Sequence, residues 1–177
     1  MRPSIVLSGY PGTGKTVVAQ LLALHQGFTR LDVAELLQTV LTAEGVKPRS
    51  RADIGPLFLQ RHSSYEIYQL IAARLELSSK VVVDAVRLEA TAVRLAGHDS
   101  LEVWYVEAPE STRLERLTER LLDAGISEDE LARHLGWYDA YNEQQDRIRY
   151  QASRIIKNDG DFDALRAVVN AAVLARS

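Results

Sequence analysis

Hydrophobic and polar positions along the chain alternate between two kinds of segment. Short apolar runs, rich in β-branched residues, have the length and composition of buried strands. Longer segments with apolar residues every three or four positions follow them and predict amphipathic helices. The clearest strand is "KVVVDAV" at 80–86, whose three consecutive valines indicate burial on both faces, as in a parallel sheet.

Strands and helices alternate over the whole sequence. The helix over 52–77 contains Gly55-Pro56, where we expect an interruption because proline lacks the N–H that a helix interior needs. Ser127 and Glu130 have the spacing of a capping box. Strands joined by helical crossovers predict a doubly wound α/β domain with a five-stranded parallel sheet. The predicted strands are 4–8, 28–31, 80–86, 101–108 and 153–159, and the helices are 15–26, 33–42, 52–77, 88–96, 109–122, one from 127, and one capped by Asp161 that ends at 174.

Composition places the chain among ordinary globular proteins, because 46% of its 177 residues are hydrophobic and 25% are charged. No repeat or linker divides it, so we treat 1–177 as one domain with a helical acceptor-binding insert at 33–78 and a short lid at 121–128. The net charge of −3 provides no basic surface for nucleic acid. Without a signal-peptide pattern or an apolar run of about 18 residues, we expect a cytoplasmic monomer or homodimer with no membrane partner.

A glycine-rich stretch, "GYPGTGKT" at 9–16, lies between the first predicted strand and the helix that follows. Gly9, Gly14, Lys15 and Thr16 fit the pattern G-x-x-x-x-G-K-[ST], with strand and helix where that motif requires them. Backbone N–H groups of such a loop surround phosphate oxygens, the lysine reaches the β- and γ-phosphates, and the hydroxyl ligates Mg²⁺. The sequence therefore predicts a P-loop for ATP and Mg²⁺, lined by Gly9, Gly12, Thr13, Gly14, Lys15 and Thr16, and hence a three-layer P-loop NTPase fold.

Two aspartates follow predicted strands. Asp84 comes directly after a run of valines, as the metal-side carboxylate of a Walker B strand does, and we assign it to Mg²⁺ and catalysis together with Thr16. Asp32 ends the second strand. Open α/β sheets bind ligands at the carboxyl ends of their strands, so both acids can face the phosphates. A helix N-cap is the alternative for both, and for Asp32 it is nearly as well supported.

Arginines are grouped on the helix that follows "EAP". Arg113, Arg116 and Arg120 are spaced i, i+3 and i+7 and share one face. Converging guanidinium groups stabilise the negative charge that spreads over a phosphoryl group during transfer. The alternative is a solvated face on which they pair with Glu115 and Glu119.

Acceptor-side candidates come from three parts of the sequence. Arg87 follows the third strand and is placed to meet an acceptor's phosphate. Arg51 and Arg61 flank the start of the long helical insert, and Asp32 joins them at the strand edge. Tyr65 and Tyr68 lie one helical turn apart and could hold a base between them, although core packing is the better supported alternative.

The order of these features resembles the nucleoside monophosphate kinase group of P-loop kinases over nearly the whole chain. The shared series is the P-loop, "LD", a helical insert, "VVVDAVR", "VEAPESTRLERLTER", a short loop, and "SEDELARHL…SRIIKNDGD". Within the group, the third strand looks most like deoxynucleoside monophosphate kinases of the phage type and relatives of dephospho-CoA kinase. The lid lacks the long insert of adenylate kinases, and "LDVAE" lacks the usual D-x-D of dephospho-CoA kinase.

The resemblance implies roles for individual positions. Arg116 and Arg120 correspond to lid-helix arginines at the transferred phosphate, and Arg133 to an arginine that bridges donor and acceptor phosphates. Asn158 corresponds to the loop against the donor adenine. Asp84 and Arg87 correspond to a D-x-x-R element at the acceptor phosphate.

These observations predict an ATP-dependent kinase of a (deoxy)nucleoside monophosphate or similar phosphorylated acceptor. A second hypothesis keeps the reaction but takes a hydroxyl acceptor, such as dephospho-CoA, a nucleoside or a sugar. A third is a regulatory module that binds ATP without transfer. The nearest string to the guanine-reading N-K-x-D of GTPases is "KNDG", which is out of order, and the chain is short for a motor or AAA ATPase.

Overall fold

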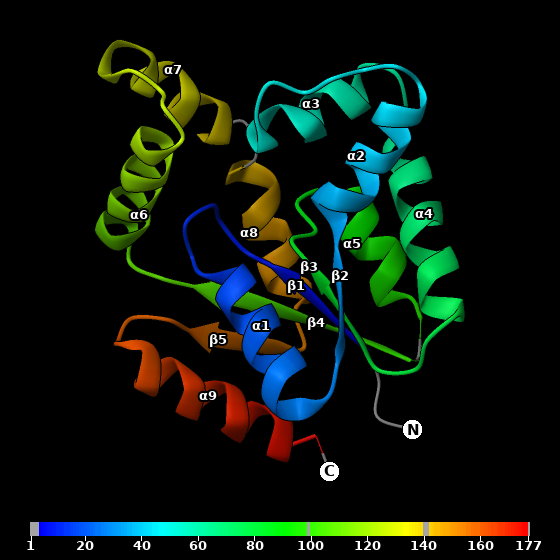
Figure 1. The fold of residues 1–177 in the computed structure, drawn as a ribbon. Coiled ribbons are helices and arrows are strands. Elements are labelled where there is room, and N and C mark those ends of the chain that lie inside the picture. The colour runs from blue at the N-terminus through cyan, green and yellow to red at the C-terminus, as the bar shows by residue number, and fades with distance from the viewer. Residues whose placement is uncertain (1–3, 99, 140–141, 177) are drawn as a thin grey trace.

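The computed structural model describes residues 4–98, 100–139 and 142–176. Its five strands form one parallel sheet in the order β2-β3-β1-β4-β5 (Figure 1). This sheet and its flanking helices confirm the predicted fold class. The strands are β1 (Ser4–Ser8), β2 (Thr29–Asp32), β3 (Val81–Asp84), β4 (Leu101–Glu107) and β5 (Arg154–Lys157).

Helices connect the strands and form the outer layers. The described helices are α1 (Lys15–Gln26), α2 (Val33–Ala43), the 3₁₀ turn η1 (Arg51–Asp53), α3 (Ile54–Leu59), α4 (Ser64–Glu76), α5 (Glu89–Ala96), α6 (Glu110–Asp123), α7 (Glu128–Asp139), α8 (Asn142–Gln151) and α9 (Phe162–Leu174). No described helix has the length and apolar character needed to cross a bilayer.

Two cores lie on opposite faces of the sheet. Because successive strand residues point to opposite sides, Trp104 of β4 packs under α1 and α9, whereas its neighbour Tyr105 packs with the helices of the other face. That second core joins side chains of α2, α3, α4, α5 and α8 to the sheet. Figure 1 shows α1 and α9 together on one side of the strands. The sheet is therefore buried on both faces, as its valine-rich strands require.

The long helical insert is interrupted at a different place from the one predicted. Gly55 and Pro56 lie inside α3, in its first turn, where a proline's missing N–H has no intrahelical partner to lose. The chain breaks instead between α3 and α4. There Ser63 and Glu66 form a capping box, with the Glu66 backbone N–H donating to Ser63 Oγ and the Ser63 N–H donating to the Glu66 carboxylate. The sequence-based prediction placed the break at the proline and did not consider this capping box.

Only part of the segment 121–128, for which we expect a lid, is a loop. Helix α6 continues to Asp123 and α7 begins at Glu128, so only 124–127 connect the two helices. Ser127 Oγ donates a hydrogen bond to the Glu130 carboxylate, at 2.8 Å, which is the contact expected from the spacing of this pair. Helices α6 and α7 stand on one side of the P-loop, and α2 to α4 stand on the other (Figure 1).

Glycine at position 9 allows the P-loop to pass against the end of β4. Gly9 has φ +138°, and an added Cβ would lie 2.3 Å from the carbonyl oxygen of Val106. Gly45 also has a positive φ, +78°, but has open space around it. We expect Gly9→Ala to lower the free energy of unfolding by about 1–3 kcal/mol more than Gly45→Ala, because only the first adds a clash to the backbone strain. Urea denaturation of both variants measures the difference, and equal losses would contradict the close approach.

Candidate functional site

At the P-loop, no side chain caps the N-terminus of α1. Gly9, Gly12 and Gly14 all have positive φ angles, which the tight turn needs. Gly14 is the N-cap of α1 and gives no side-chain cap. The first N–H groups of the helix, with the positive end of its dipole, are therefore directed at the loop, where an anion would complete their hydrogen bonds.

Lys15 is buried at the centre of this loop. Its ammonium group donates to the carbonyl oxygens of Gly9 and Tyr10, each at 2.7 Å. Burial lowers the pKa of Lys15 well below its ordinary value, and the positive charges of Arg87, Arg120 and Arg113 lower it further, against Asp84, which raises it. The surroundings of Lys15 are thus strongly cationic, as a site for a polyphosphate should be.

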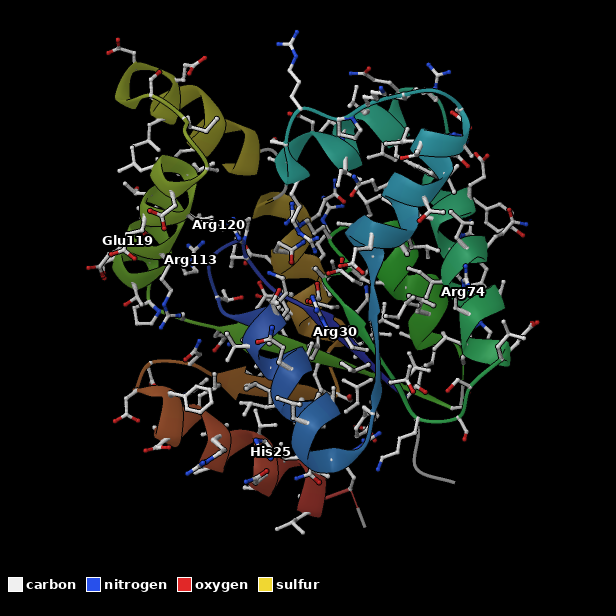
Figure 2. All side chains as sticks on the ribbon, in the orientation of Figure 1. His25, Arg30, Arg74, Arg113, Glu119 and Arg120 are labelled. Carbon is white, nitrogen blue, oxygen red and sulfur yellow. The ribbon has the colours of Figure 1, made fainter. Side chains whose placement is uncertain are left out.

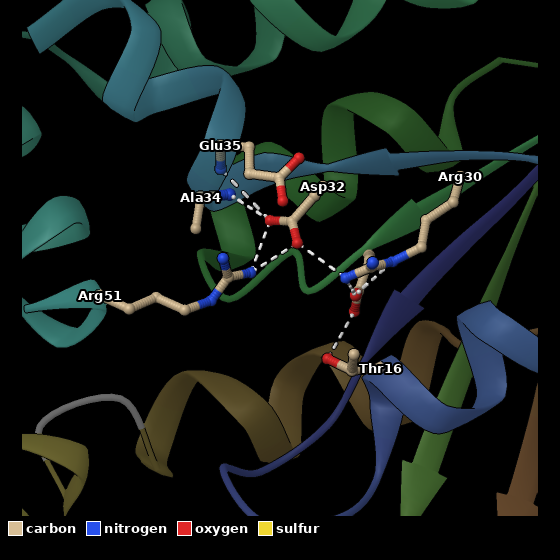
Figure 3. Close-up of polar contacts among 7 residues, drawn as sticks. Thr16, Arg30, Asp32, Ala34, Glu35 and Arg51 are labelled. Carbon is tan, nitrogen blue, oxygen red and sulfur yellow. Dashed lines mark hydrogen bonds and ion pairs between the residues drawn. The ribbon is translucent and has the colours of Figure 1, made fainter. Parts of the chain in front are cut away.

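Four charged side chains connect the P-loop to the acceptor side (Figure 3). Thr16 Oγ1 lies 3.5 Å from Asp84 Oδ1. Arg30 donates to Asp84 Oδ2 through Nη2 and Nε, at 2.6 and 3.1 Å, and to Asp32 Oδ2 at 2.7 Å. Arg51 Nη2 contacts both Asp32 oxygens at 2.6 Å. The contacts thus run in series from Asp84 to Arg30, Asp32 and Arg51.

Asp32 is also the N-cap of α2. Its Oδ1 accepts the backbone N–H groups of Ala34 and Glu35, at 3.0 and 3.3 Å, so both readings made from the sequence apply to this residue. Every Asp32 oxygen therefore has at least two donors. The carboxylate orients two arginines and a helix terminus, so few of its lone pairs are left for a substrate hydroxyl group.

Thr16 and Asp84 have the chemistry to hold Mg²⁺, which prefers hydroxyl and carboxylate oxygens. Arg30 occupies Asp84 Oδ2, whereas Oδ1 faces Thr16. Among the described residues there is no group of three or more His, Cys, Asp or Glu side chains arranged for a metal. The remaining ligands would therefore be phosphate oxygens and water, the usual shell of Mg²⁺ in phosphoryl-transfer sites.

One cavity of about 490 Å³ extends from the P-loop to the helical insert. Its cationic side chains are those of Lys15, Arg51, Arg87, Arg116 and Arg120. The wall facing the P-loop is mostly apolar, and is built from Val33, Ala34, Leu37, Ala52, Gly55, Pro56, Leu59, Ile67, Val86 and Leu88. Among the described lining residues there is no aromatic ring, carboxylate or side-chain amide.

The arginines of α6 face the P-loop, and Glu119 points away from it (Figure 2). Arg113 lies over the ring of Tyr10, 4.5 Å from its centroid. Arg116 and Arg120 line the cavity, with Arg116 Nη1 3.5 Å from the Gly12 carbonyl oxygen. Arg113 and Arg116 are half-buried in these contacts, so the alternative of a solvated face does not describe them, whereas Arg120 is exposed.

Two predicted residues lie elsewhere. Arg61 does not line the cavity; it pairs with Glu44 at 3.0 Å, and so links the end of α3 to the end of α2. Because the chain breaks between α3 and α4, Arg61 lies away from the cavity. Arg133 belongs to α7, and its side chain lies outside the described part of the structure.

Asn158 donates a hydrogen bond to the backbone of the P-loop. It is buried, and its Nδ2 donates to the Thr13 carbonyl oxygen at 2.8 Å. An added Cβ on Gly14 would lie 2.4 Å from that nitrogen. Thr13 is buried as well and donates to the Tyr10 carbonyl oxygen. Both side chains shape the loop, whereas the resemblance had implied a contact with adenine for Asn158.

Sequence analysis missed two polar residues of the site. Arg30 stands in a short predicted strand, where only its position two residues before Asp32 could have shown that the two share a face. Gln145 of α8 is buried and bridges two loops: Nε2 donates to the Arg87 carbonyl oxygen at 2.7 Å, and Oε1 accepts the Gly9 N–H at 3.1 Å and the Ser8 hydroxyl at 3.2 Å. Nothing in its local sequence distinguishes Gln145 from Gln144 and Gln151 of the same helix.

A family model described as an AAA domain matches residues 5–136, and the chain therefore belongs to that family. The match includes the P-loop, the insert and all of the residues that line the cavity. The chain's length, which we took to disfavour AAA ATPases, did not exclude this family. No curated protein matches the chain.

Solved structures of small P-loop kinases share the fold. A shikimate kinase from Bacteroides thetaiotaomicron has a TM-score of 0.67 and 18% identity, over 98% of this chain and 97% of its own. A shikimate kinase from Acinetobacter baumannii in complex with shikimate has a TM-score of 0.65 and 16% identity, over 98% of this chain and 92% of its own. A gluconokinase from Sinorhizobium meliloti 1021 has a TM-score of 0.65 and 16% identity, over 98% of this chain and 93% of its own. They support a P-loop kinase-like fold without supporting the narrower nucleoside monophosphate kinase group.

The bridge formed by Gln145 can be tested by truncation. Gln145→Ala would leave the Gly9 N–H and the Arg87 carbonyl oxygen buried without this partner, so we expect the free energy of unfolding to fall by about 1–3 kcal/mol. Gln151→Ala, at the exposed end of the same helix, should change it by less than about 0.5 kcal/mol. Chemical denaturation followed by circular dichroism measures both. Equal effects would mean that the Gln145 contacts contribute nothing to stability.

Proposed function

We propose that this protein is an ATP-dependent kinase that phosphorylates a hydroxyl group of a small acidic acceptor. The observation that carries the proposal is the single cavity of about 490 Å³, which has the P-loop on one side and the helical insert on the other. A transferase must hold donor and acceptor in contact, in a shared space from which water can be excluded. A module that only bound ATP would not need the second half of this cavity, on the side of the helical insert.

The acceptor class follows from what lines that second half. Arg51 and Arg87 supply positive charge from two different elements, and the remaining wall is largely apolar. Nucleobases are usually held by aromatic stacking, and the described lining residues include no aromatic ring. Tyr65 and Tyr68 stack on each other, 5.8 Å between centroids, and neither lines the cavity. These features favour a hydroxy acid with an apolar face over a nucleotide.

The names of the similar structures agree with this class, because shikimate and gluconate are both hydroxylated carboxylic acids. The hydroxyl-acceptor hypothesis from the sequence is thus better supported than the nucleoside monophosphate hypothesis. A nucleoside monophosphate remains the second candidate, since two arginines from separate elements would also bind a phosphate.

In the proposed reaction the acceptor's hydroxyl oxygen forms a bond to the γ-phosphorus of ATP. The bond from that phosphorus to the β–γ bridging oxygen breaks, ADP leaves with this oxygen, and the hydroxyl proton passes to water. Lys15, Arg116 and Arg120 stabilise the charge on the transferring group. Arg87 holds the acid group of the acceptor, and Arg51, whose Nη2 is bonded to Asp32, adds its remaining N–H donors. Because the transition state is loose, no strong base is required, which fits the saturated Asp32.

An ADP-release assay with ATP and Mg²⁺ tests the proposal. The acceptor panel contains hydroxy acids including shikimate and gluconate, the common nucleoside monophosphates, dephospho-CoA, nucleosides and neutral sugars. We expect ADP release to be stimulated by a hydroxy acid and not by the neutral sugars. Stimulation by monophosphates alone would establish the second candidate. ATP binding without stimulation by any acceptor would contradict the kinase proposal and favour a regulatory module.

Two substitutions separate the donor side from the acceptor side. Lys15→Ala should lower kcat about 10²–10³-fold by removing charge stabilisation at the phosphates, with circular dichroism unchanged. Arg87→Ala should raise the acceptor KM about tenfold or more while changing the Kd for ATP less than about threefold. Arg166→Ala, which removes an exposed arginine paired with Asp163 on α9, is the control and should change neither quantity. Loss of ATP binding in Arg87→Ala, with acceptor KM unchanged, would contradict the assignment of Arg87.

A further inference from the structure

Two carboxylates stand opposite each other at the P-loop edge of the sheet. Parallel pairing of β2 with β3 places Asp32 directly opposite Asp84. Their side chains are only 5% and 1% exposed. Like charges opposite each other on neighbouring strands are destabilising, and buried carboxylates require a positive partner. The arrangement therefore needs a cation between the two groups.

Arg30 supplies that cation from β2 itself. It lies two residues before Asp32 and so points to the same side of the sheet. A single nitrogen, Nη2, is 2.7 Å from Asp32 Oδ2 and 2.6 Å from Asp84 Oδ2 (Figure 3). One atom of the guanidinium group thus lies between the two carboxylates and within hydrogen-bond distance of both.

We infer that Arg30 is the resident cation of the Asp32–Asp84 pair and keeps divalent cations out of the site until nucleotide brings its own. With Arg30 and Arg51 in place, the two carboxylates are neutralised by two guanidinium groups. Only Asp84 Oδ1, beside Thr16, is then directed at the P-loop. A cation would bind there chiefly through phosphate oxygens. Arg30 is accordingly a positioning residue that makes metal uptake depend on nucleotide.

The inference deepens the proposed function by naming how this site handles its metal, and it rests on the proposed function only for the identity of that metal as Mg²⁺. Its test needs neither ATP nor acceptor. Nucleotide-free protein is heated with Mg²⁺ or Mn²⁺, with EDTA as the reference, and Tm is recorded. A negative acceptor panel would overturn the kinase proposal and leave this measurement interpretable.

Wild-type protein should show no rise in Tm with either metal. Arg30→Met exposes the two carboxylates to each other, so we expect Mn²⁺ at roughly ten times its Kd to raise Tm by about 2–4 °C. Arg30→Lys retains a cation without the arginine's fork of donors, so its rise in Tm should be smaller than that of Arg30→Met. The double variant Arg30→Met/Asp32→Asn removes one carboxylate and should lose the rise. Arg166→Met is the control for loss of a surface arginine.

Two outcomes would overturn the inference. One is a metal-dependent rise in Tm of the wild-type protein equal to that of Arg30→Met. The other is an Arg30→Met rise that persists when Asp32 is also replaced. If Arg30→Met does not fold, isothermal titration of nucleotide-free wild-type protein with Mn²⁺ decides: binding with a 1:1 stoichiometry contradicts the inference, and no binding heat, together with binding when ADP is added, supports it.

Discussion

Parallel pairing of β1 with β3 on one side and β4 on the other is the constraint on which the site depends. It makes three strand ends meet at one edge, so the loop after β1, Asp84 at the end of β3 and Asp32 at the end of β2 become neighbours. The P-loop then has a carboxylate beside it, and the insert between β2 and β3 has to cover the same edge. Packing the sheet on both faces keeps this edge rigid.

Charge at the site is balanced by groups that come from far apart in the sequence. Lys15 and the arginines of α6 and the β3–α5 segment make the cavity positive, and Asp84 is the negative group close to Lys15. Arginines, with their planar fork of donors, can bridge two carboxylates at once, which lysine cannot do equally well. The acceptor-side wall, by contrast, is apolar. A ligand with an acidic group and an apolar face matches both halves.

Strong local patterns allowed most of the fold to be predicted from the sequence. The valine run gave β3, the glycines and lysine gave the P-loop, and Asp161 was recognised as the cap of α9. The break in the insert was misplaced because a proline in the first turn of a helix costs nothing, whereas the Ser63–Glu66 cap was overlooked. A capping box and a proline can each set a helix boundary, and tertiary packing determines which of the two does so.

The candidate site was predictable where a motif carries it and unpredictable where tertiary contacts do. Lys15 and Thr16 followed from spacing alone. The distinction between Arg51, which lines the cavity, and Arg61, which pairs with Glu44, depends on the direction in which α3 leaves η1. Arg30 and Gln145 make contacts across 54 to 136 residues of sequence, which no local pattern encodes.

Gln145 has a consequence for how the site could diversify. One side chain ties the first glycine of the P-loop to the backbone at Arg87, so the P-loop and the β3–α5 segment that lines the cavity are mechanically joined. Exchanging the β3–α5 segment for that of another protein of this fold would disturb the P-loop as well. The insert from α2 to α4 has no such tie to Gln145 among the described hydrogen bonds, and it covers the cavity from outside. New acceptors are therefore most readily accommodated by sequence change in that insert.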